Sequence, residues 1–126
     1  MEKERVLVVD DEVEVREMIS KIINLIGHEA ITAESGNRAL EILKNEAISL
    51  MITDIKMPEM DGFELYRQIK KIDDKVKVCF LTAGEMDYGQ FRKELIPELD
   101  KNCYIQKPIE TEMLIIRLNR IIAPSN

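Results

Sequence analysis

The segment LMITDIKMPEMDG, residues 50–62, decides the fold of this chain. It begins as an apolar run, ends that run at the carboxylate of Asp54, and then breaks into a loop that contains Pro58 and Gly62. This pattern predicts a buried strand with Asp54 at its exposed carboxyl end. In an open parallel α/β sheet the carboxyl ends of the strands line the ligand crevice, so an acid at that position is placed for chemistry.

Apolar runs of strand length recur along the chain and alternate with segments of helical periodicity. The five predicted strands are Val6–Val9, Ala30–Ala33, Leu50–Thr53, Val76–Leu81 and Cys103–Ile105. This alternation favours right-handed βαβ crossovers, and near-continuous apolar strands favour a parallel sheet that is covered on both faces. We therefore expect an α/β fold with helices on both sides of the sheet.

The predicted helices have recognisable ends. The first should end before Gly27, with Arg16 on its polar face. The third should follow Asp61, which with Glu64 fits a capping box. The last predicted helix is Thr111–Ile122. We expect residues 1–123 to form one domain and residues 124–126 to be a tail or the start of a linker.

Composition excludes several classes of function. The chain has 126 residues and a net charge of -6, which disfavours a nucleic-acid surface because such a surface needs clustered Lys and Arg. The first apolar run is too short for a signal peptide or a membrane span, so we expect a cytoplasmic protein with no membrane contact. Cys79 and Cys103 lack the spacing of a zinc site or a CxxC pair and are expected to be thiols.

Acidic residues end two of the predicted strands. Asp10 and Asp11 follow the first strand as Asp54 follows the third, so the three carboxylates should converge if these strands are neighbours. Converging carboxylates repel one another, and hard oxygen ligands with an open side suit Mg²⁺. Thr82 and Lys107 end the fourth and fifth strands with a hydroxyl and a cation. This combination indicates phosphoryl transfer to Asp54, because such transfer depends mainly on positioning and charge neutralisation.

These residues together resemble the receiver domain of two-component response regulators, the CheY-like superfamily, in its single-domain form. The matching elements are Asp10-Asp11, Asp54, the loop Met57–Gly62, Thr82-Ala83, and Tyr104 before Lys107-Pro108. The resemblance spans nearly the whole chain. It implies a flavodoxin-like, doubly wound (βα)5 three-layer sandwich with a parallel sheet of order 2-1-3-4-5.

The resemblance also implies a role for each matched residue. Asp54 would accept a phosphoryl group from a sensor histidine kinase or phosphotransfer protein, and a downstream protein partner would then respond. Direct Mg²⁺ ligands would be Asp11, Asp54 and the backbone carbonyl of Lys56, with Asp10 acting through water. Lys107 would contact the phosphoryl oxygens, and Thr82 and Tyr104 would form the conformational switch. The Lys107-Pro108 bond is expected to be cis.

Two departures from the family pattern stand out. The segment Glu85–Asn102 is several residues longer than usual and contains Pro97, which is incompatible with an unstrained helix interior. Lys56 and Gly84 lie two residues beyond Asp54 and Thr82, at positions that tune acyl phosphate hydrolysis in the family. We expect Lys56 to reach the phosphoryl group.

Several functional interpretations remain open from the sequence. The chain is either a stand-alone receiver or a receiver excised from a longer regulator, and it should catalyse only its own phosphorylation and dephosphorylation. An alternative from another class is a small Mg²⁺-dependent phosphohydrolase with Asp54 as nucleophile, although Lys56 stands where such enzymes place a second acid. A third is a receiver-like module that binds partners without phosphorylation.

Overall fold

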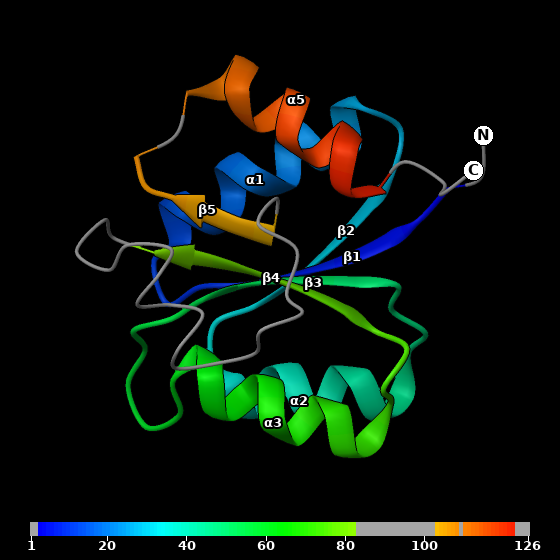
Figure 1. Cartoon of the computed structure of the whole chain (residues 1–126), viewed down its shortest axis with the longest axis vertical. Helices are drawn as coiled ribbons and strands as arrows, with labels where there is room; N and C mark the ends of the chain where they lie inside the picture. The colour runs from blue at the N-terminus through cyan, green and yellow to red at the C-terminus, as the bar shows by residue number, and fades with distance from the viewer. Residues whose placement is uncertain (1–2, 83–102, 109, 123–126) are drawn as a thin grey trace.

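The computed structural model describes residues 3–82, 103–108 and 110–122 of the chain. The elements in these residues are β1 (Arg5–Val9), α1 (Val13–Leu25), β2 (Glu29–Ala33), α2 (Gly36–Asn45), β3 (Leu50–Asp54), α3 (Gly62–Ile72), β4 (Lys77–Thr82), β5 (Tyr104–Gln106) and α5 (Thr111–Ile122). Helices α1 and α5 lie on one side of the sheet, and α2 and α3 lie on the other (Figure 1). The three-layer α/β architecture is confirmed.

The five strands form one parallel sheet of order β2-β1-β3-β4-β5, as predicted. Each predicted strand is present within one residue at either end. In the register, Val9 lies beside Thr53 and Asp54 lies beside Leu81. The carboxyl ends of β1, β3 and β4 therefore meet at one edge of the sheet, and this edge carries the acidic residues.

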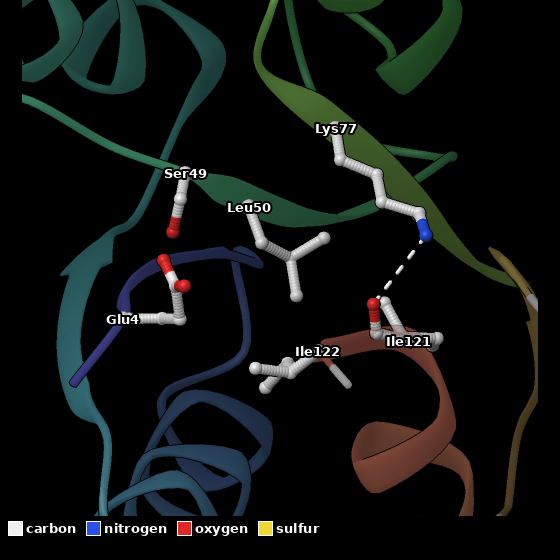
Figure 2. A pocket seen from close by; sticks show the side chains of 6 residues that line it. All are labelled: Glu4, Ser49, Leu50, Lys77, Ile121 and Ile122. Carbon is white, nitrogen blue, oxygen red and sulfur yellow. Dashed lines mark hydrogen bonds between the residues drawn. The ribbon is translucent and has the colours of Figure 1, made fainter. Parts of the chain in front are cut away.

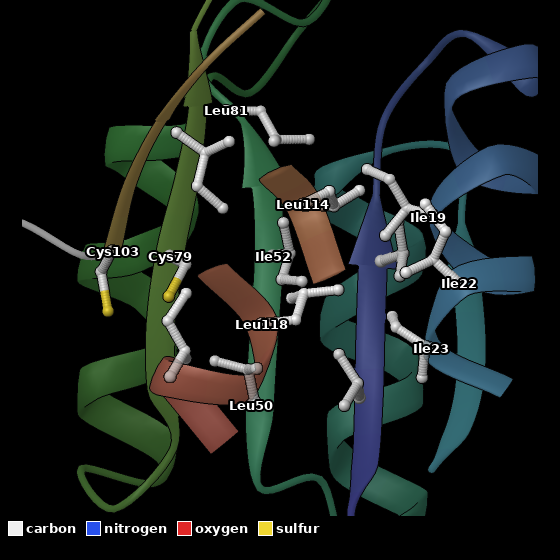
Figure 3. Packing of buried hydrophobic residues seen from close by; sticks show 14 residues of the cluster. Ile19, Ile22, Ile23, Leu50, Ile52, Cys79, Leu81, Cys103, Leu114 and Leu118 are labelled. Atoms are coloured by element: carbon white, nitrogen blue, oxygen red, sulfur yellow. The ribbon is translucent and has the colours of Figure 1, made fainter. Parts of the chain in front are cut away.

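The core is divided by the sheet into two apolar clusters. Along β1, Val6 and Val8 belong to the cluster under α1 and α5, and Leu7 and Val9 belong to the cluster under α2 and α3. All four are completely buried. Figure 3 shows the first cluster, in which residues of α1 and α5 pack over the central strands. Burial on both faces explains why the strands are apolar without alternation.

The helix ends match most of the sequence signals. Gly27 follows α1 with a φ of 98°, a conformation that glycine adopts without steric cost. Asp61 caps α3 by accepting a hydrogen bond from the Glu64 amide at 2.8 Å. The Glu64 carboxylate contacts side chains of its own helix, including Gln68 at 3.0 Å. Helix α5 has the predicted bounds.

The amino-terminal edge of the sheet holds a small pocket at the end of α5. Its volume is about 140 Å³, and it is lined by Glu4, Ser49, Leu50, Lys77, Ile121 and Ile122 (Figure 2). Lys77 Nζ donates to the carbonyl of Ile121 at 3.4 Å, which ties the last turn of α5 to the first residue of β4. His28, nearby in the fold, is buried, and its Nδ1 accepts the Glu4 amide at 3.0 Å. This contact is structural, because it ties the start of β1 to the start of β2.

Two sequence predictions concern residues that the structure does not describe. The segment Glu85–Asn102 and Gly84 lie outside the described residues.

Cys79 and Cys103 are buried thiols in the cluster under α1 and α5. In the part of the chain that the structure describes, no helix is long and apolar enough to cross a membrane.

Candidate functional site

Asp10, directly after β1, is held from three directions. It is completely buried, and its Oδ1 accepts the amide of Glu12 at 2.9 Å. Its Oδ2 accepts from Lys107 Nζ at 2.9 Å. Its backbone carbonyl accepts from Arg16 Nη1 at 2.7 Å. A buried carboxylate is costly unless it is paired and hydrogen-bonded, and Asp10 meets both conditions.

Asp54, the last residue of β3, has one engaged oxygen and one that faces a cation. Its Oδ1 accepts the amide of Ile55 at 2.9 Å, and its Oδ2 lies 3.6 Å from Lys107 Nζ. The start of α3 packs directly against this position, because the amide of Gly62 donates to the Ile55 carbonyl at 2.7 Å. A Cβ atom on Gly62 would collide with the backbone carbonyl of Asp54. Glycine is therefore required here for close backbone approach.

Lys107 joins the fifth strand to the acidic residues. Its backbone amide donates to the Thr82 carbonyl at 2.7 Å, and the Lys107-Pro108 bond is cis. Its ammonium contacts Asp10 and Asp54, and lies 3.8 Å from a Glu12 oxygen. Burial lowers the pKa of Lys107, but the hydrogen bond to Asp10 and the attraction of the surrounding carboxylates outweigh burial and raise the pKa above its ordinary value. Lys107 is therefore a permanent cation in this site.

The pKa of Asp54 is shifted strongly. Burial, followed by repulsion from Asp10, raises the pKa of Asp54 from 3.8 to about 6, against the opposing attraction of Lys107. The carboxylate is therefore mostly ionised at pH 7, but its negative charge is poorly stabilised. A cation that approached this oxygen cluster would relieve the repulsion.

The acidic residues after β1 fit a divalent cation. One carboxylate oxygen from each of Asp10, Asp11 and Glu12 lies within 4.8 Å of the others. Asp10 is buried while Asp11 and Glu12 are exposed, so the group opens toward solvent. Oxygen donors with an open side suit Mg²⁺, which retains several waters. These oxygen donors suit the cation that the sequence indicated, but the cluster includes Glu12, which was not among the predicted ligands, and it does not include Asp54.

The remaining predicted residues occupy distinct places around this edge. Thr82 is buried at the end of β4, one register step beyond the Leu81 that pairs with Asp54. Lys56 is exposed in the loop after β3. Tyr104 is half-buried, packs against the cluster under α2 and α3, and its carbonyl accepts from Arg117 Nη1 at 2.9 Å. The geometry thus brings Asp10, Asp54 and Lys107 into contact and leaves Lys56 at the surface.

Sequence reasoning missed two contributors, Glu12 and Arg16. Glu12 is the N-cap residue of α1, yet its side chain makes no capping hydrogen bond and its carboxylate lies near Lys107. Arg16 was predicted only as a residue of the polar face of α1, and its side chain turns back to the Asp10 carbonyl. No spacing in the sequence marks either contact, because Arg16 reaches a backbone carbonyl six residues earlier and Glu12 faces a lysine from the far end of the chain.

Comparison with known proteins identifies the family. The sequence model of the response regulator receiver domain family matches residues 6–119 of this chain. This chain belongs to the response regulator receiver domains. Receiver domains of two-component systems are phosphorylated by histidine kinases or phosphotransfer proteins and bind Mg²⁺ at an acidic cluster.

This receiver domain has relatives of different lengths. It is 38% identical over 96 residues to sporulation initiation phosphotransferase F of Bacillus subtilis (strain 168), an alignment that covers 75% of this chain and 77% of that protein. It is 33% identical over 122 residues to the probable transcriptional regulator ycf27 of Porphyra purpurea. That alignment covers 96% of this chain but 48% of the regulator, so the receiver spans about half the length of such relatives.

Solved structures agree with the fold. The response regulator protein TrrA of Thermotoga maritima, in complex with Mg²⁺-BeF, superposes with a TM-score of 0.74 at 30% sequence identity. The match covers 94% of this chain and 99% of that chain. The flavodoxin-like topology predicted for the receiver is therefore confirmed.

Proposed function

We propose that Asp54 is the phosphoacceptor of this receiver domain. One observation carries the proposal: the Asp54 carboxylate ends β3 with one oxygen held by the Ile55 amide and the other 3.6 Å from the Lys107 ammonium, beside the acidic residues that follow β1. A nucleophile at the end of a rigid strand, next to a fixed cation, meets the positioning and charge requirements of phosphoryl transfer.

The proposed reaction is a transfer from a phosphohistidine of a kinase or phosphotransfer protein. An Asp54 oxygen attacks phosphorus, the phosphorus–nitrogen bond breaks, and its electron pair returns to the imidazole of the donor. The product is an acyl phosphate on Asp54. Lys107 stabilises the negative charge on the phosphoryl oxygens, and Asp10 holds Lys107 in place at 2.9 Å.

We assign the cation site to Asp11, Asp54 and the backbone carbonyl of Lys56, with Asp10 acting through water. When bound, Mg²⁺ neutralises charge between the carboxylates and the phosphoryl oxygens. Two observations support a cation here. The carboxylates of Asp10, Asp11 and Glu12 cluster after β1, and repulsion from Asp10 and Asp11 contributes to the raised pKa of Asp54. Thr82 and Tyr104 form the proposed switch, in which the Thr82 hydroxyl moves toward the phosphoryl group and the Tyr104 ring adjusts its packing. The proposed receiver unit is residues 1–123.

Intact mass spectrometry tests the acceptor. The full chain is incubated with acetyl phosphate, with and without Mg²⁺, and compared with Asp54→Asn. A Mg²⁺-dependent gain of one phosphoryl group in the wild type, absent in the variant, is the expected result. An equal gain in both proteins refutes Asp54 as acceptor. Multiple turnover on a phosphomonoester would instead indicate the phosphohydrolase alternative.

A further inference from the structure

Arg16 makes a contact that the proposed phosphotransfer chemistry does not explain. It lies in the first half of α1, and its Nη1 donates to the carbonyl of Asp10 at 2.7 Å in a partly buried position. The Asp10 amide in turn donates to the Ala33 carbonyl at 3.2 Å. Both backbone groups of Asp10 are therefore tied, one to the neighbouring strand β2 and the other to a helix that begins three residues later.

The carbonyl that Arg16 holds belongs to the peptide unit joining Asp10 to Asp11. Fixing this peptide plane fixes the direction in which the chain leaves β1, and so the position of the Asp11 carboxylate relative to that of Asp10. A guanidinium suits the task because its donors form a rigid planar fork, whereas a lysine ammonium is a flexible point charge. A cation site needs its donors at set distances, so this orientation affects affinity.

We propose that Arg16 is a positioning residue of the acidic site: by holding the Asp10–Asp11 peptide, it sets how tightly the site binds a divalent cation. The inference rests on the proposed function, since the site is the one assigned above to Mg²⁺. Arg16 touches neither the cation nor the phosphoryl group, and it acts through the backbone of Asp10.

The charge of Arg16 and its proposed positioning role predict changes of opposite sign in Mg²⁺ affinity when Arg16 is removed. A guanidinium near a cluster of carboxylates repels Mg²⁺, so removing its charge without any structural effect should tighten binding several-fold. Losing the hydrogen bond that orients the Asp10–Asp11 peptide should weaken Mg²⁺ binding. Arg16→Met removes both, and the sign of the change shows which effect is larger.

Lys21 provides a matched control on the same helix. Its side chain lines the same groove between α1 and β2 as Arg16, and it is exposed. Lys21→Met therefore removes one positive charge from the same groove and leaves the Arg16 contact with Asp10 in place. Arg16→Lys is the complementary variant, because it keeps the charge and loses the planar fork.

Isothermal titration of the EDTA-stripped full chain with MgCl₂ measures the dissociation constant. We expect Arg16→Met to weaken Mg²⁺ binding about five- to tenfold, Arg16→Lys about two- to threefold, and Lys21→Met to change it less than twofold. Unchanged or tighter binding by Arg16→Met overturns the proposal. A lower melting temperature in EDTA with an unchanged dissociation constant assigns Arg16 a purely structural role and also overturns it.

The outcomes separate this inference from the proposed function. If Arg16→Met does not fold by far-UV circular dichroism, Arg16→Lys decides, and an unchanged Mg²⁺ affinity in that variant counts against positioning. If wild type takes up a phosphoryl group on Asp54 while the Arg16 variants bind Mg²⁺ normally, only the inference fails. If wild type neither binds Mg²⁺ nor takes up the phosphoryl group, the proposed function fails with it.

Discussion

Replacing Asp54 by asparagine should stabilise the protein, and the gain should depend on pH. The pKa of Asp54 is raised from 3.8 to about 6 in the folded state, chiefly by burial and then by repulsion from Asp10. A group whose folded pKa lies above its unfolded value contributes stability that is fully present below pH 3.8 and is lost as the pH rises through 6. Wild type therefore loses stability between about pH 4 and 6.5, and Asp54→Asn does not.

The magnitude follows from the same pKa values. One pKa unit corresponds to about 1.4 kcal/mol, so ionised Asp54 costs the folded state about 3 kcal/mol. An asparagine Oδ1 still accepts the Ile55 amide, and the pKa of about 6 already includes the attraction of Lys107. We therefore expect a net gain of about 3 kcal/mol at pH 7.5 and about 1 kcal/mol at pH 4.5, where the unfolded carboxyl is already mostly ionised.

Urea unfolding in EDTA, followed by far-UV circular dichroism at pH 4.5, 6.0 and 7.5, measures this difference. Asp74→Asn is the control, because Asp74 is an exposed carboxylate in the connection between α3 and β4, at the opposite edge of the sheet from Asp54. A gain of equal size at all three pH values would refute the reasoning, since it would show that the substitution acts on packing and not on the ionisation of Asp54. Added Mg²⁺ should shrink the gain by stabilising wild type more than the variant.

Three further changes test neighbouring contacts. Gly62→Ala should destabilise the fold by about 2 kcal/mol or more in urea unfolding, because the new methyl collides with the Asp54 carbonyl, and a loss below 0.5 kcal/mol would contradict that geometry. Lys107→Met should cost about 2 to 3 kcal/mol in EDTA by leaving the buried Asp10 carboxylate without its cation, and Mg²⁺ should recover part of the loss in thermal melts. Lys56→Ala should change the dephosphorylation rate of the acyl phosphate, measured by mass spectrometry over time, and an unchanged rate would leave Lys56 a surface residue.

The sequence predicted the fold well because strands that are buried on both faces consist almost entirely of apolar residues. Strands such as β1 and β3 must be apolar throughout, and a charged or hydroxyl residue is tolerated only where the strand emerges. Asp54 and Thr82 are the last residues of β3 and β4, so the same two residues indicated both where these strands end and which polar groups lie there. The last helix was also placed correctly, since its apolar positions pack over the sheet.

The missed features lie where the backbone turns without a regular period. In the loop after β3, the sequence indicated a break at Pro58 but not the positive φ of 69° at Glu59, which lies in a tight turn where the Met60 amide donates to the Pro58 carbonyl. In the loop after β1, Arg16 satisfies a carbonyl that sequence periodicity does not reveal. Periodicity assigns a residue to a helix face, but it does not show whether a long side chain extends to solvent or folds back to the preceding loop.

The pocket at the amino-terminal edge of the sheet has a consequence for engineering. Glu4, just before β1, and Ile122, at the end of α5, both line this pocket, so the two ends of the described chain emerge side by side. Asp54 and Thr82 lie at the opposite ends of their strands from Leu50 and Lys77, which line the same pocket. Domains with adjacent ends tolerate insertion into the surface loops of other proteins. If this receiver is inserted into a host protein through two short connectors, the edge that carries Asp54 will point away from the junction.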